Sequence, residues 1–493
     1  MPNSDPGAAG DGTTAVISCT SDPGGRTQCP ATTSAGVVLV RTTGAAACLL
    51  GHTWGYDQTS VWVSDGCGGE FLLGPQAVPA TPPPDQPQER EPTPRNDTWG
   101  DLDPGRGFLI GRTSAGELAV SAYAVVRYLN QMPGDETFTD HLGQERVVRG
   151  RHDIFPHRIL VWLKGWVGVP KLVYTLTLWT VNTTDQDAIF GNIGYQFSPR
   201  FNLYAGINGN PGSRSMQGSH PFWLGHDRVM ADEFFRPFFA AGVYAQGEAV
   251  RGLWYNAMIG NSNSALGIRA TQLDRRFTTG GSVWWMPTTK EFGPRGAYGD
   301  WEQHEQLATR FGVSTTQSRE QRYTDPDNFN TGNTTLRLAD GLNVFETGTL
   351  APGITVDQVD YRILSFDAGM KYKGFFLQTE IYSRWLDNFV ADGPLPVASI
   401  FDRGFFVQGS FYPIARKLEL YGVTSQIFGD QDAGFDHSDE YGGGFNYYPA
   451  DTRNHRFNLQ VLRVNGSPVS STFGYYVGGQ TGTTLSAAFS VFF

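Results

Sequence analysis

The sequence has no apolar stretch of the length that a membrane-spanning helix needs. Such a helix takes about 18 uncharged apolar residues. The best candidate, LVYTLTLWTV at residues 172–181, is shorter and is interrupted by threonine. We therefore expect no helical membrane anchor.

Motifs of common catalytic sites are also missing. The chain contains no Gly-x-Ser-x-Gly, no His-Glu-x-x-His and no Gly-x-x-x-x-Gly-Lys-Ser/Thr sequence. Its nine His are scattered, and the acidic clusters at 226–233 and 436–440 fit solvated loops better than cation sites. We predict a protein that is not an enzyme and uses no cofactor or metal.

Charged residues are few, at 17% of the chain. Of the 37 Lys+Arg and 48 Asp+Glu, 4 and 12 precede residue 104, which leaves 33 and 36 for the rest. The long C-terminal part is thus nearly neutral, and nucleic acid, which needs basic surfaces, is not expected as a partner.

Cysteine occurs only four times, at Cys19, Cys29, Cys48 and Cys67. The tight Cys-x2-4-Cys pairs of structural zinc sites are absent. An even, clustered set favours two disulfides and an oxidising compartment, with three pairings open. The start of the chain lacks the pattern of a secretion signal, so the chain is either cytoplasmic or numbered after a removed signal.

Proline divides the chain. Nine of the 29 prolines fall between Pro75 and Pro104, which predicts an extended spacer. We expect a flexible tail at 1–14, a four-cysteine domain at 15–74, a Pro-rich linker at 75–104 and a barrel domain at 105–493.

What the chain has in abundance is glycine (61 residues) and aromatics (13%), which favour an all-β fold. From residue 117 onward, apolar and polar side chains alternate over stretches of about ten residues. In LSAAFSVFF, for example, Leu485, Ala487 and Phe489 oppose Ser486 and Ser490. Alternation of this length is typical of strands that cross an outer membrane.

Short turns and long polar loops alternate between these stretches, with short turns near 168, 197, 246, 372, 412 and 448. The parity predicts a sixteen-stranded antiparallel transmembrane barrel whose strands start near residues 118, 155, 170, 188, 200, 237, 250, 279, 307, 360, 374, 403, 417, 438, 454 and 483. The last strand would close the barrel on the first.

A soluble propeller or large sandwich also alternates, but no repeat of about 40–50 residues recurs. Aromatics near strand ends favour the membrane barrel, because interfacial girdles lie there. The residues we assign to such girdles are Trp162, Trp166, Trp179, Trp284, Trp285, Tyr447 and Tyr448.

Several long phrases carry a family resemblance: residues 190–208 (FGNIGYQFSPRFNLYAGIN), 286–296 (MPTTKEFGPRG), 345–353 (FETGTLAPG), 359–384 (VDYRILSFDAGMKYKGFFLQTEIYSR) and 385–396 (WLDNFVADGPLP). Over about residues 105–493 the chain resembles the phosphate-selective porin O and P family. The resemblance implies a general or anion-favouring diffusion channel of the bacterial outer membrane, usually a homotrimer, whose third loop folds inward.

Here that loop would be residues 209–235. Arg214, His220, His226 and Arg228 would face acidic neighbours there, while Phe222, Trp223, Phe234 and Phe235 would pin the loop to the wall. Cationic rings select anions by their field. Six further basic residues lie on polar strand faces and would extend the path: Arg127, Arg158, Lys164, Lys171, Arg310 and Arg384.

Two considerations limit this prediction. Loop charges are often solvated or paired with one another, and Glu380 shares the face of Arg384. We therefore expect only weak selectivity for small hydrophilic solutes and ions, phosphate among them, with its sign open. A lumen filled by side chains would exclude diffusion.

The four-cysteine region leaves a second function open. Trp54, Tyr56 and Trp62 would stack on carbohydrate or, as we favour for a small stapled domain, form its core together with Val63. By the barrel parity this region would lie in the periplasm, near peptidoglycan or a periplasmic partner. The alternative to a channel is a barrel-anchored adhesin or glycan-binding protein.

Overall fold

The computed structural model describes residues 15–33, 36–74, 107–181, 186–218, 220–263, 276–323, 336–470 and 475–493. The chain divides into two compact units, Met1–Thr93 and Pro94–Phe493. The tail expected at 1–14 and the linker expected at 75–104 lie outside the described residues. Across the described ranges, no helix is long and apolar enough to cross a membrane.

The N-terminal unit, called the head below, consists of two three-stranded antiparallel sheets with the strand orders β1-β6-β3 and β2-β5-β4. Its strands are β1 (Val16–Thr20), β2 (Arg26–Pro30), β3 (Val37–Thr42), β4 (Trp54–Tyr56), β5 (Ser60–Ser64) and β6 (Gly68–Leu73). Both expected disulfides form, as Cys19–Cys29 and Cys48–Cys67.

The aromatic residues of the head divide between core and surface. Trp54 and Val63 are buried with Phe71 in its core, whereas Tyr56 is 44% exposed. Trp62 is half-buried and lies under the Arg26 guanidinium, 4.0 Å from its ring centroid. The core interpretation is therefore correct for Trp54 and Val63 but wrong for Tyr56.

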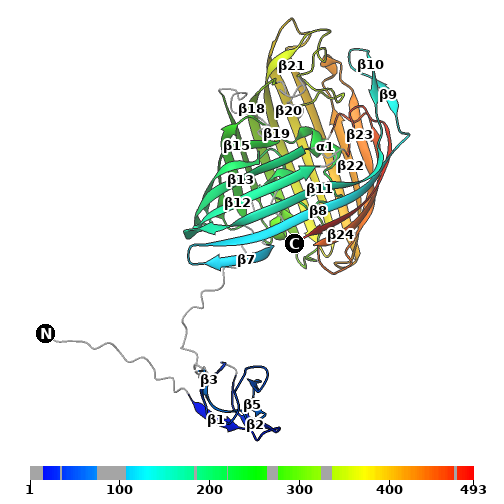
Figure 1. The fold of residues 1–493 in the computed structure, drawn as a ribbon. Helices are drawn as coiled ribbons and strands as arrows, with labels where there is room; N and C mark the ends of the chain where they lie inside the picture. Colours follow the sequence, from blue (N-terminus) through cyan, green and yellow to red (C-terminus); the bar gives the residue numbers. More distant parts are fainter. Residues whose placement is uncertain are drawn as a thin grey trace, which may run out of the picture. The chain divides into compact units, whose positions relative to one another are not determined.

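The C-terminal unit is a closed antiparallel barrel of sixteen strands (Figure 1). They are β8 (Gly116–Met132), β11 (His152–Val167), β12 (Val169–Val181), β13 (Gln186–Ser198), β14 (Phe201–Gly209), β15 (Phe239–Val250), β16 (Leu253–Asn261), β17 (Phe277–Trp285), β18 (Ala308–Gln321), β19 (Val356–Tyr372), β20 (Phe375–Ala391), β21 (Ser399–Ile414), β22 (Leu418–Phe428), β23 (His437–Tyr447), β24 (His455–Asn465) and β25 (Gly482–Phe492). Every predicted start lies within about four residues of an observed one, so the sixteen-strand prediction is confirmed.

Closure takes place between β25 and β8, whose pairing runs from Thr483 opposite Met132 to Phe492 opposite Tyr123. A further short strand, β7 (Phe108–Thr113), pairs with the first residues of β8. A small hairpin, β9 (Glu136–Thr139) and β10 (Glu145–Val148), lies in the connection from β8 to β11. Together these pairings leave no open edge in the cylinder.

The connections are long at one end of the barrel and short at the other. Long connections include 133–151, 210–238 and 322–355, whereas β19 and β20 are joined by Lys373 and Gly374 alone. Both of these residues have positive φ, at 48° and 85°, as a type I′ hairpin turn requires. One connection at the short-turn end, residues 286–307, is long.

Alternation sorts the side chains as expected. On β20, Phe375, Leu377 and Ile381 point outward and are exposed, while Gln378, Glu380 and Arg384 point inward and are buried. The same two faces occur on β8, β12, β14 and β25, but on β12 inward-facing Thr175 is only half-buried and Lys171 is exposed. The outer surface is consequently apolar and the interior largely polar.

The predicted aromatic girdle needs correction. Trp285 and Tyr447 are exposed on the outer surface, but Trp162, Trp166, Trp179, Trp284 and Tyr448 point inward. Position near a strand end does not decide the face, because the face depends on parity along the strand. Other aromatics are exposed on the outer surface near the short-turn end, namely Phe197, Phe201, Tyr372, Phe375, Phe411 and Phe493.

We predict that the Cys48–Cys67 disulfide stabilises the head and leaves the barrel unaffected. The double variant Cys48→Ser, Cys67→Ser should lower the free energy of unfolding of the head by about 3 kcal/mol, because a closed loop of this size restricts the unfolded chain. Limited proteolysis of the full chain at rising temperature measures this, with heat-dependent gel migration of the barrel as the control. Unchanged resistance of the head would contradict the prediction.

Closure at β8 also depends on Phe493. Its backbone N–H donates to the Ala122 carbonyl and its carbonyl accepts from the Ala122 N–H, both at 3.1 Å, and its ring lies 4.9 Å from that of Phe108. Deleting Phe493 should therefore reduce the fraction of heat-modifiable, folded barrel. Phe489→Ala, which removes an exposed ring but no backbone contact, serves as the control and should fold like the parent.

Candidate functional site: the barrel interior

The connection between β14 and β15 lies inside the barrel. This inner loop, residues 210–218 and 220–238, contains the helical turn η1 (Arg214–Gln217) and the short helix α1 (Met230–Phe235), and most of its residues are buried. Near its start, after β14, the Pro211 carbonyl accepts a hydrogen bond from the Thr316 hydroxyl. Near its end, before β15, the Phe235 carbonyl accepts a hydrogen bond from the Tyr361 hydroxyl. It corresponds to the predicted loop 209–235.

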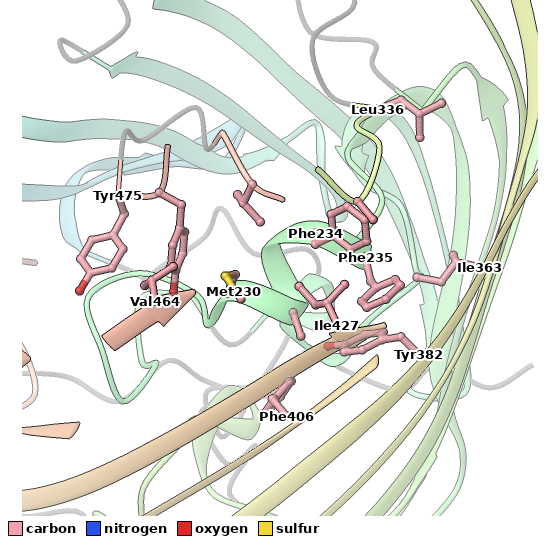
Figure 2. Packing of buried hydrophobic residues seen from close by; sticks show 14 of the residues in the cluster. Met230, Phe234, Phe235, Leu336, Ile363, Tyr382, Phe406, Ile427, Val464 and Tyr475 are labelled. Carbon is pink, nitrogen blue, oxygen red and sulfur yellow. The ribbon is translucent and has the colours of Figure 1, made fainter. Parts of the chain in front are cut away.

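Aromatic contacts fix this loop to the wall. Phe235 stacks on Tyr382 with ring centroids 5.0 Å apart, and Phe222 meets Phe492 at 5.1 Å. Figure 2 shows Met230, Phe234 and Phe235 of α1 among apolar side chains of the strands. Burial of these rings provides the hydrophobic contribution that holds the loop in place.

Backbone N–H groups in the first turn of α1 donate hydrogen bonds to side chains of the barrel wall. The Met230 N–H donates to a Glu440 carboxylate oxygen and the Ala231 N–H to the Ser425 hydroxyl, both at 2.7 Å. The first N–H groups of a helix have no partner within it and would be costly to bury alone. Side chains of β22 and β23 thus act as caps for a helix far away in sequence.

Asp227 joins the loop to the opposite strands. Its carboxylate accepts from Arg127 at 2.7 Å and from Arg158 at 2.9 Å, and all three side chains are less than 10% exposed. Burial raises the pKa of the Asp227 carboxyl, and the two guanidinium groups oppose this rise. Arg127 and Arg158 are therefore inward-facing, as predicted, but they are paired with the loop.

Three further predicted arginines are also paired with carboxylates. Arg310 contacts Asp367 at 2.9 Å, Arg384 contacts Asp402 at 2.6 Å, and Arg228 lies 3.6 Å from Asp232. Each pair is buried, where an uncompensated charge would be costly. The positive charge that these side chains present to a passing ion is thus largely cancelled.

The two predicted histidines of the loop lie in surroundings that oppose their protonation. His220 Nε2 lies 3.0 Å from Arg158 Nη1, and because a guanidinium only donates, this nitrogen must accept. Burial and the charge of Arg127 lower the pKa of His226 well below its usual value. That both contribute to a cationic ring stays a prediction, and the cost of charging a buried imidazole opposes it.

Arg214 is buried among aromatic rings. Its backbone N–H donates to Glu380, its guanidinium donates to the Gly296 carbonyl at 2.9 Å, and it lies 4.4 Å from the Tyr298 ring centroid. Burial lowers its pKa to about 10, so it stays charged at neutral pH. It contacts a second inward segment.

That second segment is residues 286–307, between Trp285 and Ala308, which we call the base segment. It includes the helical turn η3 (Pro294–Gly296) and buries Phe292, Ala297 and Tyr298 in the barrel. Sequence reasoning missed its inward course. Two features of the sequence could have indicated this inward course: the length of the segment at the short-turn end and its aromatic residues.

A cluster in the base segment has the spacing of metal ligands, formed by Asp300, Glu302 and His304. His304, however, lies between Asp300 and Glu291, which accept from its two ring nitrogens. These carboxylates raise the pKa of His304 to about 9, and the histidine in turn helps to lower the pKa of both. In this structure His304 and the carboxylates of Asp300 and Glu291 form a network of ion pairs.

One part of the interior wall is less covered than the rest. The hydrogen bonds and ion pairs from the inner loop to the strands go to β8, β11, β18–β20 and β22–β24. On β11–β13, inward-facing Lys164, Thr175 and Asn192, which lie side by side across the strands, keep intermediate exposure. Inward-facing Trp254 and Trp284 are also half-buried, and Lys171 is exposed near the short-turn end.

We predict that Asp227 is required for stability. In Asp227→Asn, Arg127 and Arg158 lose a buried carboxylate, which should lower the free energy of unfolding by about 3–5 kcal/mol. Urea titration followed by tryptophan fluorescence measures the change. Asp432→Asn, at an exposed carboxylate of the helical turn η4 (Gln431–Ala433), is the matched control. Equal midpoints for both variants would contradict the prediction.

Comparison with known proteins gives a family-model match near the N-terminus and similarities to solved structures. Residues 4–89 match a family described as "Protein of unknown function (DUF3011)". No curated protein matches the chain. The resemblance of residues 105–493 to the phosphate-selective porin O and P family therefore stays a prediction.

Among solved structures, the chain is similar to the outer membrane protein OmpT of Vibrio cholerae in a trimer form (11% identity, TM-score 0.45, 77% of this chain and 100% of that one). It is also similar to an anion-selective porin from Comamonas acidovorans (12% identity, TM-score 0.44, 77% of this chain and 100% of that one). A third similar structure is OmpF of Salmonella typhi (12% identity, TM-score 0.44, 78% of this chain and 100% of that one). At this level the likenesses carry no conclusion about the function of this chain.

Proposed function

We propose that the C-terminal unit is an outer-membrane channel through which small hydrophilic solutes and ions diffuse passively, without enzymatic activity. The observation that carries the proposal is the closed sixteen-stranded barrel with an apolar outer surface and a polar interior. Closed barrels leave no backbone group unsatisfied in lipid, and an apolar exterior suits the hydrocarbon layer. A soluble barrel would not gain from so many exposed Phe, Leu and Ile side chains.

The permeation path that we propose is off-centre. It runs along β11–β17, where inward-facing Lys164, Thr175 and Asn192 remain partly accessible. The inner loop would form its constriction, since this loop fills the part of the interior next to β8 and β18–β24. In a fully packed core these inward-facing side chains would be buried, so their partial exposure supports a passage along this side of the wall.

Selectivity by charge is proposed to be weak. Arg127, Arg158, Arg310 and Arg384 are paired with carboxylates within hydrogen-bond distance, and the surroundings of His220 and His226 oppose their protonation. Anions such as phosphate would pass among other solutes, without a dedicated site. Lys164 and Lys171 lie on the less covered wall, so a change in the charge of either would alter the field along the path.

Location and assembly follow from the same proposal. The turn between β7 and β8 lies at the short-turn end of the barrel, next to Gly168, whose N–H donates to the Ala115 carbonyl. We propose that this end and the head face the periplasm, with lipid around the barrel. A homotrimer is proposed from the resemblance of residues 105–493.

The head suggests a second candidate function. Exposed Tyr56 offers ring surface to a glycan such as peptidoglycan, whereas Arg26 covers one face of the Trp62 ring. The chain would then be a barrel-anchored glycan-binding protein. Pull-down of the full chain with purified peptidoglycan, compared with Tyr56→Ala, tests this candidate.

Conductance in planar bilayers tests the channel. The folded, heat-modifiable barrel should give discrete current steps and should make liposomes permeable to small sugars but not to large ones. Under a salt gradient, the ratio of anion to cation permeability should stay close to one. Folded barrel that inserts but passes neither ions nor sugars would overturn the proposal.

Lys164 should influence the sign of the selectivity. Lys164→Glu reverses one charge on the less covered wall, so the reversal potential should shift toward cation preference. Lys417→Glu, on an exposed turn, is the control and should leave the reversal potential near that of the parent. If the two variants behave alike, the path does not run along β11.

A further inference from the structure

We propose that the base segment forms a second constriction, at the short-turn mouth of the barrel, and that Lys371 is the residue that positions it. This inference rests on the proposed channel function. The base segment connects β17 to β18, at an end of the barrel where other strand pairs, such as β19–β20 and β21–β22, are joined by only two or three residues.

The base segment is attached to the wall through its backbone. Lys371, on the inward face of β19 and fully buried, donates from Nζ to the Phe292 carbonyl at 2.8 Å and to the Ala297 carbonyl at 2.7 Å. Its Nζ also lies 4.8 Å from the Phe292 ring centroid. One ammonium group thus holds both ends of the η3 turn, which no apolar residue could do.

The base segment then meets the inner loop. The Tyr298 N–H donates to the Phe222 carbonyl at 2.9 Å, and Arg214 of the loop donates to the Gly296 carbonyl. Arg453, from the turn after β23, donates to the Tyr298 carbonyl at 2.7 Å and lies over the Phe222 ring. Two segments that enter from opposite ends of the barrel are therefore joined inside it.

Beyond Tyr298 the segment crosses toward other strands. Asp300 accepts from the Gly374 N–H at 2.7 Å, in the β19–β20 turn, and Trp301 lies 4.8 Å from the Tyr448 ring, after β23. The base segment thus covers the mouth over β18–β24, the same half that the inner loop fills. Both segments leave the β12–β17 half as the remaining passage, so release of either should widen it.

The test compares Lys371→Met with Lys373→Met in the full chain. Met keeps most of the side-chain volume but removes both hydrogen bonds to the base segment. Single-channel conductance of Lys371→Met should rise roughly twofold over the parent, since the segment no longer blocks the mouth. Lys373→Met, in the exposed turn two residues away, should conduct like the parent.

Thiol labelling gives an independent readout. Ala297 is fully buried, so Ala297→Cys should react slowly with a membrane-impermeant maleimide and should react at least about tenfold faster when combined with Lys371→Met. If Lys371→Met lacks heat-dependent migration and so does not fold, replacement of residues 289–303 by a Gly-Ser turn takes its place in the conductance test.

The outcomes separate the two proposals. If the parent inserts but does not conduct, the channel function fails, whereas the labelling rates still test the position of the base segment. If the parent conducts, and neither conductance nor labelling changes in the folded Lys371→Met or shortened variants, the second constriction is overturned.

Discussion

The pairing of β25 with β8 is the constraint on which the rest of the structure depends. It joins residues more than 350 positions apart, from Thr483 and Met132 to Phe492 and Tyr123. Without it the sheet would have two free edges, and an open edge can be satisfied neither in lipid nor in the packed interior. Once the cylinder is closed, each strand has an inside and an outside, and its alternating side chains are assigned to one or the other.

Closure creates a second constraint, because the inward faces carry charge that must be compensated. Asp227 between Arg127 and Arg158, Arg310 with Asp367, and Arg384 with Asp402 meet this requirement within the protein. Such pairs seldom add much stability, but breaking one leaves a charge that is expensive to bury. Arg127 and Arg158 therefore position the inner loop, and the charges of all four arginines are largely compensated by the carboxylates beside them.

The interior is filled from both ends. The inner loop is held by aromatic rings and by helix caps from β22 and β23, and the base segment is held by Lys371 and Asp300. Their junction, at Phe222 and Tyr298, lies between a loop from the long-loop end and a connection from the short-turn end. The function of the barrel thus depends on how two irregular segments pack, more than on the strands around them.

Local sequence patterns determined the strands, their order and the face of most side chains, because alternation with a period of two residues is visible within ten residues. Through alternation they also indicated that Arg127, Arg158 and Arg384 point into the barrel, whereas the inward fold of residues 209–235 was implied by the family resemblance and by no local pattern. They misplaced Trp162 and Tyr448, where closeness to a strand end was given more weight than parity. Only the tertiary structure decided the disulfide pairing, the burial of His226, the partner of each paired arginine and the inward course of residues 286–307. Each of these depends on contacts between residues far apart in sequence, such as Arg127 with Asp227 or Lys371 with Phe292, and no local pattern records which distant groups burial brings together.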